Sequence, residues 1–270
     1  MKLSLIKKKI RWTFDRYTYL YIGIHFFQGN FSVKNYWKLK KDRNVFLAQS
    51  KNSAIDFPIT KLRPCYADSV DDAGSLSFHY FFQDLFVAQR IFFNNPLTHV
   101  DIGSRVDGFI AHIASFREIE VFDIRPLEIK IPNVVFKQLD IMDENNIEKG
   151  SVSSISCLHA LEHFGLGRYG DPINFDGFLA GFSNIANLLR KGGKFYFSVP
   201  IGPQRVEFHA HRVFSLSFLL KMIVPYYHID MFSYIDDQNH FYPDVELTEN
   251  IIESNCICNY GCGIFELTRR

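Results

Sequence analysis

The stretch from residue 98 to residue 199 alternates short apolar segments with segments of helical spacing, and this alternation constrains the fold most. It predicts strands over residues 98–102, 118–123, 133–139, 151–157 and 194–199. Helices are predicted over 77–93, 106–116, 175–190 and 215–223, and further strands over 226–235 and in the tail 256–267. We expect Lys191-Gly192-Gly193 to end the helix before it, and Pro200 to end the strand after it. This order favours an α/β fold whose mostly parallel sheet carries helices on both faces.

The first part of the chain differs in charge from the rest. Residues 1–63 hold fourteen lysines and arginines but three acidic residues, a formal charge of +11 in a chain whose total is +1. The remainder therefore carries −10. We expect residues 1–61 to form a basic, aromatic-rich helical extension and residues 62–270 to form one folded domain. The extension either contacts an anionic surface or folds back on the acidic domain.

The basic run from Lys7 to Arg16 is interleaved with aromatic residues, a pattern that suits an anionic membrane surface. Peripheral membrane contact through residues 1–20 is one expectation, and packing of a solvated N-terminal helix is the other. Nucleic acid ranks below both as a partner, because the domain is acidic and contains no recognition motif.

The five cysteines are too few and too unevenly spaced for a disulfide framework. Cys256 and Cys258 alternate as on one face of a strand, so we interpret both as core residues and expect no zinc site in the pattern that they form with Cys262. No secretory signal is recognisable, and the apolar stretch 19–27 is too short to span a bilayer. These features predict a cytoplasmic location, either free or at the inner face of the membrane.

Acidic residues follow three successive predicted strands: Asp101, Asp123 and Asp140. In an open parallel sheet the carboxyl ends of the strands border the ligand-binding crevice. Gly103 and Gly108 allow the chain to turn tightly and to approach a ligand after the first strand. Asp123 is placed to accept hydrogen bonds from ribose hydroxyls, and Asp140 to receive an adenine amine.

These features resemble the successive motifs of class I S-adenosylmethionine (SAM)-dependent methyltransferases. The motifs are Asp101-x-Gly103, Asp123, Asp140, the strand 152–157 and the segment LLRKGGKFYFSVP at 188–200. Four segments also resemble an uncharacterised family of that superfamily, a domain of unknown function whose bacterial members are associated with surface-polysaccharide gene clusters. They are LRPCYAD at 62–68, HVDIGSRVDG at 99–108, FDIRP at 122–126 and HALEHFGLGRYGDP at 159–172.

The resemblance implies a Rossmann-like, doubly wound sheet of the class I methyltransferase type over residues 62–270, with SAM as cofactor. The implied activity is methyl transfer to a small or glycan-linked acceptor, such as a sugar hydroxyl. The first motif departs from the family pattern, because Arg105 and Asp107 replace two of its glycines. Arg105 either binds the methionine carboxylate of SAM or blocks it. A non-catalytic module that binds a nucleotide or nucleotide sugar in cell-surface polysaccharide assembly is therefore the alternative.

The segment after the fourth strand holds the candidate catalytic residues His159, Glu162 and His163. Methyl transfer to a hydroxyl requires removal of a proton, and His159 is our first candidate for the base, oriented by Glu162. The alternative is that a histidine packs against the loop while Glu162 pairs with Arg168. His209 and His211 either form a wall of the acceptor pocket or, with His159 or His163 and Asp171 or Glu207, bind a divalent metal, although the His-x-His spacing is common. A nicotinamide dehydrogenase is a weaker interpretation, because the glycine fingerprint of that class is absent.

Overall fold

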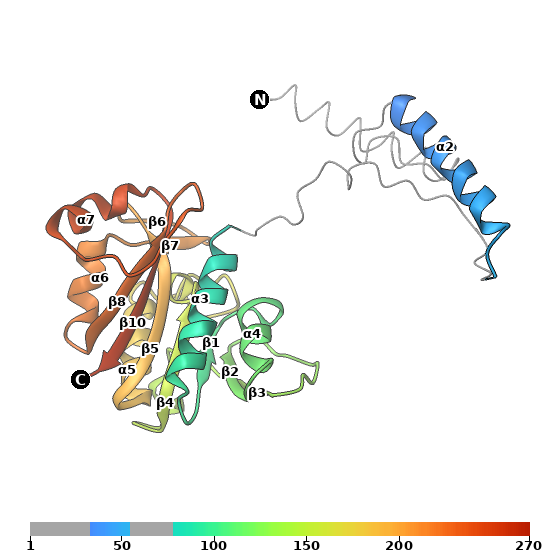
Figure 1. Ribbon diagram of the computed structural model, residues 1–270. Helices are drawn as coiled ribbons and strands as arrows, with labels where there is room; N and C mark the ends of the chain where they lie inside the picture. Colours follow the sequence, from blue (N-terminus) through green and yellow to red (C-terminus); the bar gives the residue numbers. More distant parts are fainter. Residues whose placement is uncertain (1–32, 55–77) are drawn as a thin grey trace. The chain divides into compact units, whose positions relative to one another are not determined.

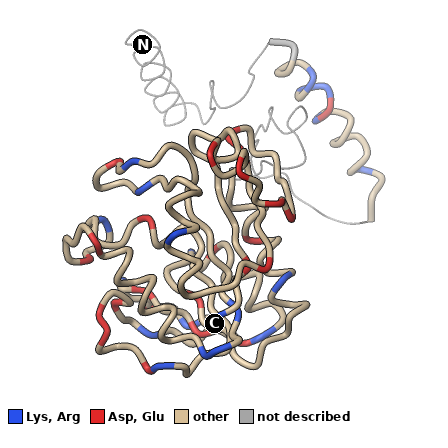
Figure 2. Tube along the Cα trace, turned by 90° about the vertical axis from the view of Figure 1, so that its left-hand side faces the viewer, with Lys and Arg blue, Asp and Glu red and all other residues tan. Residues whose placement is uncertain are grey.

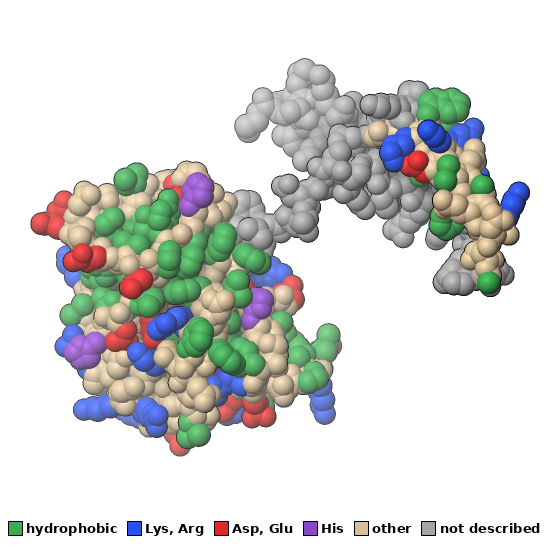
Figure 3. All heavy atoms as spheres, in the orientation of Figure 1, with side chains coloured by type: hydrophobic (Ala, Val, Ile, Leu, Met, Phe, Trp, Pro, Cys, Tyr) green, Lys and Arg blue, Asp and Glu red, His purple; other side chains and the backbone are tan. Residues whose placement is uncertain are grey.

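The computed structural model describes residues 33–54 and 78–270 of the chain. The chain divides into two compact units, Met1–Leu76 and Ser77–Arg270. The described part of the first unit, residues 33–54, consists of helix α2 (Val33–Ser50), along which Figure 3 shows basic side chains, and a short turn after it. The predicted boundary near residue 62 and the predicted membrane-contacting segment 1–20 lie outside the described residues. Among the helices that are described, none has the length and apolar character needed to cross a membrane.

The second unit is built on an eight-stranded sheet with the order β3-β2-β1-β4-β5-β10-β8-β9 (Figure 1). Its strands are β1 (Val100–Ile102), β2 (Ile119–Asp123), β3 (Val134–Gln138), β4 (Val152–Leu158), β5 (Leu189–Ile201), β8 (Tyr227–Ile235), β9 (Phe241–Tyr242) and β10 (Gly261–Arg269). Strands β1 to β5 are parallel, and β10 runs antiparallel between β5 and β8. The strand order reverses between β1 and β4, where ligands of such sheets bind. The predicted mostly parallel sheet is confirmed.

Two hydrophobic clusters attach helices to opposite faces of this sheet. One packs α5 (Gly177–Leu188), α6 (Leu216–Ile223) and α7 (Glu249–Ser254) on side chains such as Phe197 and Phe265. The other packs α3 (Phe78–Asn94) and α4 (Ala111–Ala114) on side chains such as Tyr196 and Ile264. Acidic and basic side chains are both spread over this unit (Figure 2). The sheet is therefore covered on both sides, and its strand ends remain available for a site.

Three local predictions were wrong in detail. Helix α5 ends at Leu188, because Leu189 is already extended and pairs with Val152 of β4. The Lys-Gly-Gly segment therefore lies within β5, opposite a register shift in β4. Pro200 does not end β5, which continues to Ile201. Its missing N–H costs no ladder bond, because β4 has ended opposite Ser198 and the carbonyl of Pro200 accepts from Phe214.

The predicted helix over 106–116 forms as two short pieces. A wide helical turn, η1 (Val106–Ile110), precedes α4, and Gly108 within it has non-helical angles of φ −122° and ψ −111°. The hairpin of β6 (Arg205–Glu207) and β7 (His211–Val213), strand β9 and helix α7 were not predicted. Cys256 and Cys258 are buried as expected, but Cys256 lies in a turn, η4 (Asn255–Ile257), and Cys258 just after it.

Serines occur in the fully buried strand β4 because a polar ladder joins it to β1. His99 contacts Ser154 through Nδ1 at 2.8 Å and Ser156 through Nε2 at 3.1 Å. Burial lowers the pKa of His99 to about 3, so this imidazole is neutral. Ser156 donates its hydroxyl to the carboxylate of Asp101. The ladder fixes the end of β1, from which the first loop of the site departs.

Candidate functional site

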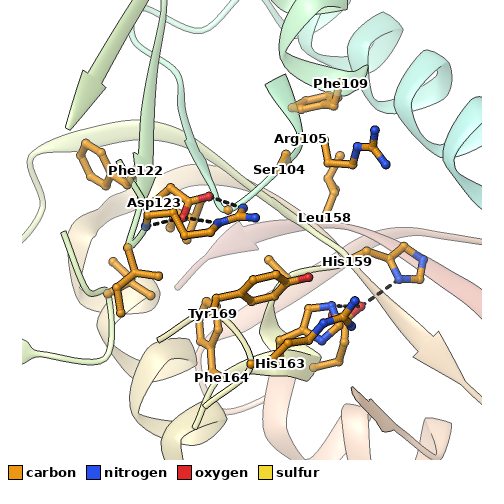
Figure 4. Close-up of a pocket in the computed structure, with 18 of the residues that line it drawn as sticks. Ser104, Arg105, Phe109, Phe122, Asp123, Leu158, His159, His163, Phe164 and Tyr169 are labelled. Atoms are coloured by element: carbon orange, nitrogen blue, oxygen red, sulfur yellow. Dashed lines mark hydrogen bonds and ion pairs between the residues drawn. The ribbon is translucent and has the colours of Figure 1, made fainter. Parts of the chain in front are cut away.

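A cavity of about 700 Å³ opens at the carboxyl ends of β1 to β4, where the strand order reverses. Its walls come from the loops after these four strands, from one face of α3, and from Tyr260 just before β10. The volume falls within the usual range for small-molecule sites. Figure 4 shows Asp123 on one side of this cavity and His159 and His163 on the other. Residues more than a hundred positions apart in the sequence thus line the same cavity.

Asp123 ends β2 and lines the cavity, as the position of a ribose-binding acid requires. Its side chain is 12 % exposed, and both carboxylate oxygens accept from the guanidinium of Arg125, at 3.0 and 2.7 Å. The ring of Tyr169 lies 4.5 Å from the centre of that guanidinium. A ribose would therefore share Asp123 with Arg125 or displace the arginine. The backbone N–H of Arg125 also donates to Oδ1, at 2.8 Å, so Oδ1 already has two donors, and only Oδ2 has a lone pair left for a ribose hydroxyl while the pair with Arg125 is intact.

Asp140 lines the cavity, whereas Asp101 does not. The Asp140 carboxylate accepts from the backbone N–H of Met142 at 2.8 Å, and its second oxygen is left for a ligand. Asp101 is fully buried and accepts from the backbone N–H and the hydroxyl of Ser104, both at 2.9 Å. Burial raises the pKa of Asp101 to about 7. Asp101 therefore holds the loop after β1 in place. The prediction that its side chain contacts the ligand was wrong, because Asp101 does not line the cavity.

The loop after β1 passes through both predicted glycines. Gly103 has a φ of +75°, and a side chain there would lie 3.0 Å from the Cβ of Ala160. A side chain at Gly108 would lie 3.0 Å from a carboxylate oxygen of Asp84. Arg105 lies between them and points outward, 69 % exposed, in a surface ion pair with Asp107. It lines the cavity rim without filling the cavity, so it is free to turn toward an anionic group.

His159 and Glu162 form a buried ion pair beside the cavity. The Nδ1 atom of His159 lies 2.9 Å from Oε1 of Glu162, and the two side chains are 5 % and 2 % exposed. Burial opposes charge on His159, but its neighbours Cys262 and Glu162 outweigh burial and raise the pKa of the imidazole well above its usual range. Burial likewise opposes charge on Glu162, yet His159 lowers the pKa of this carboxyl. The pair is thus ionised, and Glu162 contacts the histidines, whereas the alternative pairing of Glu162 with Arg168 is not formed.

His163 is the better placed proton acceptor of the two histidines. Its Nδ1 lies 2.7 Å from the carbonyl oxygen of Ala210, and a carbonyl only accepts, so Nδ1 carries the proton. Burial lowers the pKa of His163, which leaves a neutral ring with a lone pair on Nε2. This Nε2 lies 3.8 Å from Glu162, and the ring meets Tyr169 edge-on at 5.3 Å. The carboxylate would stabilise the charge that His163 gains with a proton.

Arg212 anchors the loop that carries these residues. Its guanidinium donates to the carbonyl oxygens of Glu162, Phe164 and Phe175, at 3.3, 2.7 and 3.0 Å. It also lies 4.7 Å from the centre of the Phe178 ring. The side chain is buried, and the backbone carbonyls on which it acts would otherwise lack these donors. Arg212 therefore anchors this loop from the neighbouring hairpin.

Sequence reasoning missed the part of the wall that comes from distant elements. Tyr80, Gln83 and Asp84 reach the cavity from α3, and Tyr260 reaches it from the turn before β10. Helical spacing marks such residues as core candidates, but nothing local indicates which sheet edge they will meet. His211 also lines the cavity, as one of the open alternatives expected, whereas His209 is exposed.

Comparison with known proteins gives one family match and many matches of fold. A family profile described as a Caenorhabditis protein of unknown function, DUF268, matches residues 128–257, slightly less than half of the chain. A search of curated proteins finds no sequence relative. The predicted link to bacterial polysaccharide clusters is supported by neither comparison.

The solved structures share the fold at low sequence identity. The [4+2]-cyclase SpnF is 11 % identical with a TM-score of 0.50, over 68 % of this chain and 79 % of that one. The N-methyltransferase NodS of Bradyrhizobium japonicum, solved with S-adenosylhomocysteine (SAH), is 11 % identical with a TM-score of 0.47, over 72 % and 89 %. A Burkholderia thailandensis didemethyltoxoflavin N1-methyltransferase is 11 % identical with a TM-score of 0.49, over 88 % and 91 %. The strand order and the likeness to the cyclase show that the chain has the predicted Rossmann-like fold of the class I methyltransferase type.

Proposed function

We propose that the protein is a SAM-dependent methyltransferase whose acceptor is a hydroxyl of a small or glycan-linked molecule. The observation that carries this proposal is the joint placement of Asp123, Asp140 and a neutral His163 around one cavity. The first two suit an adenosine, and the third suits a hydroxyl that must lose its proton. The family resemblance adds the cofactor, and the cofactors named with some fold relatives, SAM and SAH, agree with it.

The residues present fit the cofactor with two side-chain rearrangements, of Arg125 and of Arg105. Asp123 would hold the ribose hydroxyls once Arg125 shares or leaves its carboxylate, and Asp140 would receive the adenine amine. Arg105 would turn from Asp107 to the methionine carboxylate, which costs little because its present ion pair is exposed. Gly103 keeps the backbone close to the ligand. SAM, when bound, supplies a methyl group that leaves its sulfonium sulfur for an attacking oxygen.

The chain supplies orientation and proton removal. Nε2 of His163 accepts the acceptor's hydroxyl proton, while the bond from Nδ1 to Ala210 keeps the ring in the reactive tautomer. Glu162 stabilises the resulting imidazolium, and its Oε2, buried without a partner, is available to a second hydroxyl of the acceptor. His159 is held as a cation by Glu162, so we assign it to positioning and not to the base.

One observation favours the alternative, a nucleotide-sugar-binding module without catalysis. Tyr169 is flanked by two guanidinium groups, those of Arg125 at 4.5 Å and Arg168 at 5.1 Å from the ring centre. Paired guanidinium groups recognise phosphates. In addition, the likeness to a cyclase means that the fold alone does not specify methyl transfer. The two functions differ in whether the cavity binds SAM.

Calorimetric titration of the full chain with SAH separates them. The methyltransferase proposal predicts binding, and it predicts that Asp123→Ala weakens binding by at least about 100-fold, because two hydrogen bonds to a charged group are lost. Glu120→Ala, in the same strand but outside the cavity, serves as the control and should leave affinity unchanged. Absence of SAH and SAM binding at millimolar concentration, with a UDP-sugar binding instead, would establish the alternative.

A further inference from the structure

Three metal-ligating side chains from distant parts of the chain meet beside the cavity. They are His79 near the start of α3, His159 after β4, and Cys262 in β10. One ligand atom from each lies within 4.8 Å of the others, and all three side chains are buried. Tetrahedral metal sites bring ligand atoms to somewhat shorter separations, about 3.3–3.8 Å, which small side-chain rotations would achieve. The fold thus brings together the ligand atoms of residues that are up to 183 positions apart in the sequence.

The atom that points to a ligand is Nε2 of His159. It is buried, the side chain is only 5 % exposed, and no group of the described residues lies at ordinary hydrogen-bond distance from it, although the thiol of Cys262 is close enough to interact with the ring electrostatically. A buried polar atom without a partner is uncommon in a folded protein and requires an explanation. His159 also has a φ of +48°, in the left-handed region that a non-glycine residue adopts at a cost. The surrounding structure thus holds the backbone of His159 in an unfavourable conformation, which fixes the position of the ring.

Glu162 completes the arrangement on the other side of the ring. Its Oε1 lies 2.9 Å from Nδ1 of His159, so the carboxylate orients the imidazole and leaves Nε2 toward the other two groups. Histidine ligands of metals commonly have such a carboxylate on their second nitrogen. His79 stacks on His159 with ring centres 5.8 Å apart.

We propose that His79, His159 and Cys262 form a site for a zinc-class divalent cation at the edge of the cavity. One thiolate and two imidazoles suit Zn²⁺ or its spectroscopic substitute Co²⁺, whereas Mg²⁺ and Ca²⁺ prefer oxygen ligands. Binding releases the thiol proton of Cys262 and the Nε2 proton of His159 to solvent. The fourth position is open to water. This site is absent from the sequence-based expectations because its ligands share no local spacing.

A bound ion would join α3 to β10 and to the loop after β4. At this end, α3 already contacts β10 through the thiol of Cys262, which donates to Oε1 of Gln83 at 3.6 Å, and His79 stacks on both His159 and Tyr260. Because His159 and Tyr260 line the cavity, the ion would also fix part of its wall. The site shares His159 and Glu162 with the proposed methyl-transfer site, but its test requires neither SAM nor an acceptor.

The test is a titration of the chelator-treated full chain with Co²⁺, followed by displacement with Zn²⁺. We expect one ion per chain and an absorption band from thiolate-to-cobalt charge transfer, which Zn²⁺ abolishes. Cys262→Ser should remove the band, and Cys258→Ser, at another buried cysteine, should retain it. Glu162→Gln should weaken binding by roughly 10- to 100-fold while keeping the band.

The titration of the wild-type protein tests the proposal even if a variant fails to fold. No charge-transfer band at a tenfold excess of Co²⁺ over wild-type protein would overturn it. A band of equal intensity in Cys262→Ser, checked for folding by circular dichroism, would also overturn it. His79→Gln provides a second ligand variant on a different element and should weaken binding of the cation at least tenfold.

Discussion

The buried carboxyl group of Asp101 makes a prediction about stability that can be worked out from the structure. Its pKa rises from 3.8 to about 7 on burial in the folded protein. The folded state therefore holds a proton on Asp101 between these two values, whereas the unfolded state releases it. The stability that this proton contributes is present below pH 4 and is lost as the pH rises to 7. At about 1.4 kcal/mol per pKa unit, the loss is about 4 kcal/mol.

Replacement by asparagine removes this titration and keeps the shape. In Asp101→Asn, the amide oxygen still accepts from the backbone N–H of Ser104, and the amide nitrogen donates to the hydroxyls that now face the carboxylate. We expect the variant and wild type to be equally stable at pH 4.5 within about 1 kcal/mol. The variant should become relatively more stable by up to about 4 kcal/mol at pH 8.

The assay is urea unfolding of both full-length proteins at intervals between pH 4.5 and pH 8, followed by circular dichroism. The quantity compared is the difference in unfolding free energy between the two proteins, in which the titration of all other groups cancels. Asp107→Asn is the control, because Asp107 is exposed and paired with Arg105 at the surface. A difference that stays constant with pH, or that favours wild type as the pH rises, would refute the reasoning.

Two further predictions concern the loop that holds the catalytic candidates. Arg212→Met leaves three backbone carbonyls without their donor, and should lower the free energy of unfolding by about 3 kcal/mol in urea denaturation. The exposed Arg190→Met is the control, and an equal effect of both variants would contradict the anchoring role. Gly165→Ala and Gly170→Ala both place alanine at positive φ, but only at 165 would the new Cβ meet a backbone atom, the Asn174 oxygen, at 1.9 Å. Gly170→Ala should cost about 1 kcal/mol and Gly165→Ala at least about 2 kcal/mol more, and equal costs would exclude the steric explanation.

The sheet was predictable because each strand carries its own local signal. The apolar segments at 118–123 and 151–157 have flanking turn residues and a length typical of buried parallel strands, and the structure has strands there. The hairpin of β6 and β7 carries no such signal. Each of its strands has three residues, and charged side chains such as Arg205 and Glu207 give it no apolar periodicity.

Part of the candidate site could also be predicted from local sequence signals. Asp123 and Asp140 were found because the end of a parallel strand marks the site edge on its own. The burial of Asp101 and the ion pair between Asp123 and Arg125 depend on contacts that only the folded chain makes. The same is true of His79 and Cys262, which reach His159 from opposite ends of the domain. Contacts between residues this far apart in the sequence leave no local pattern from which they could be predicted.

The most direct test of the central claim is a crystal structure of the protein with SAH. The account predicts an adenosine in the cavity after β1 to β4, with both ribose hydroxyls within about 3 Å of the Asp123 carboxylate and the adenine amine next to Asp140. It also predicts that Arg125 will have moved to share or release Asp123. An intact Arg125–Asp123 pair with the ligand bound elsewhere, or with no ligand bound at saturating SAH, would contradict the account.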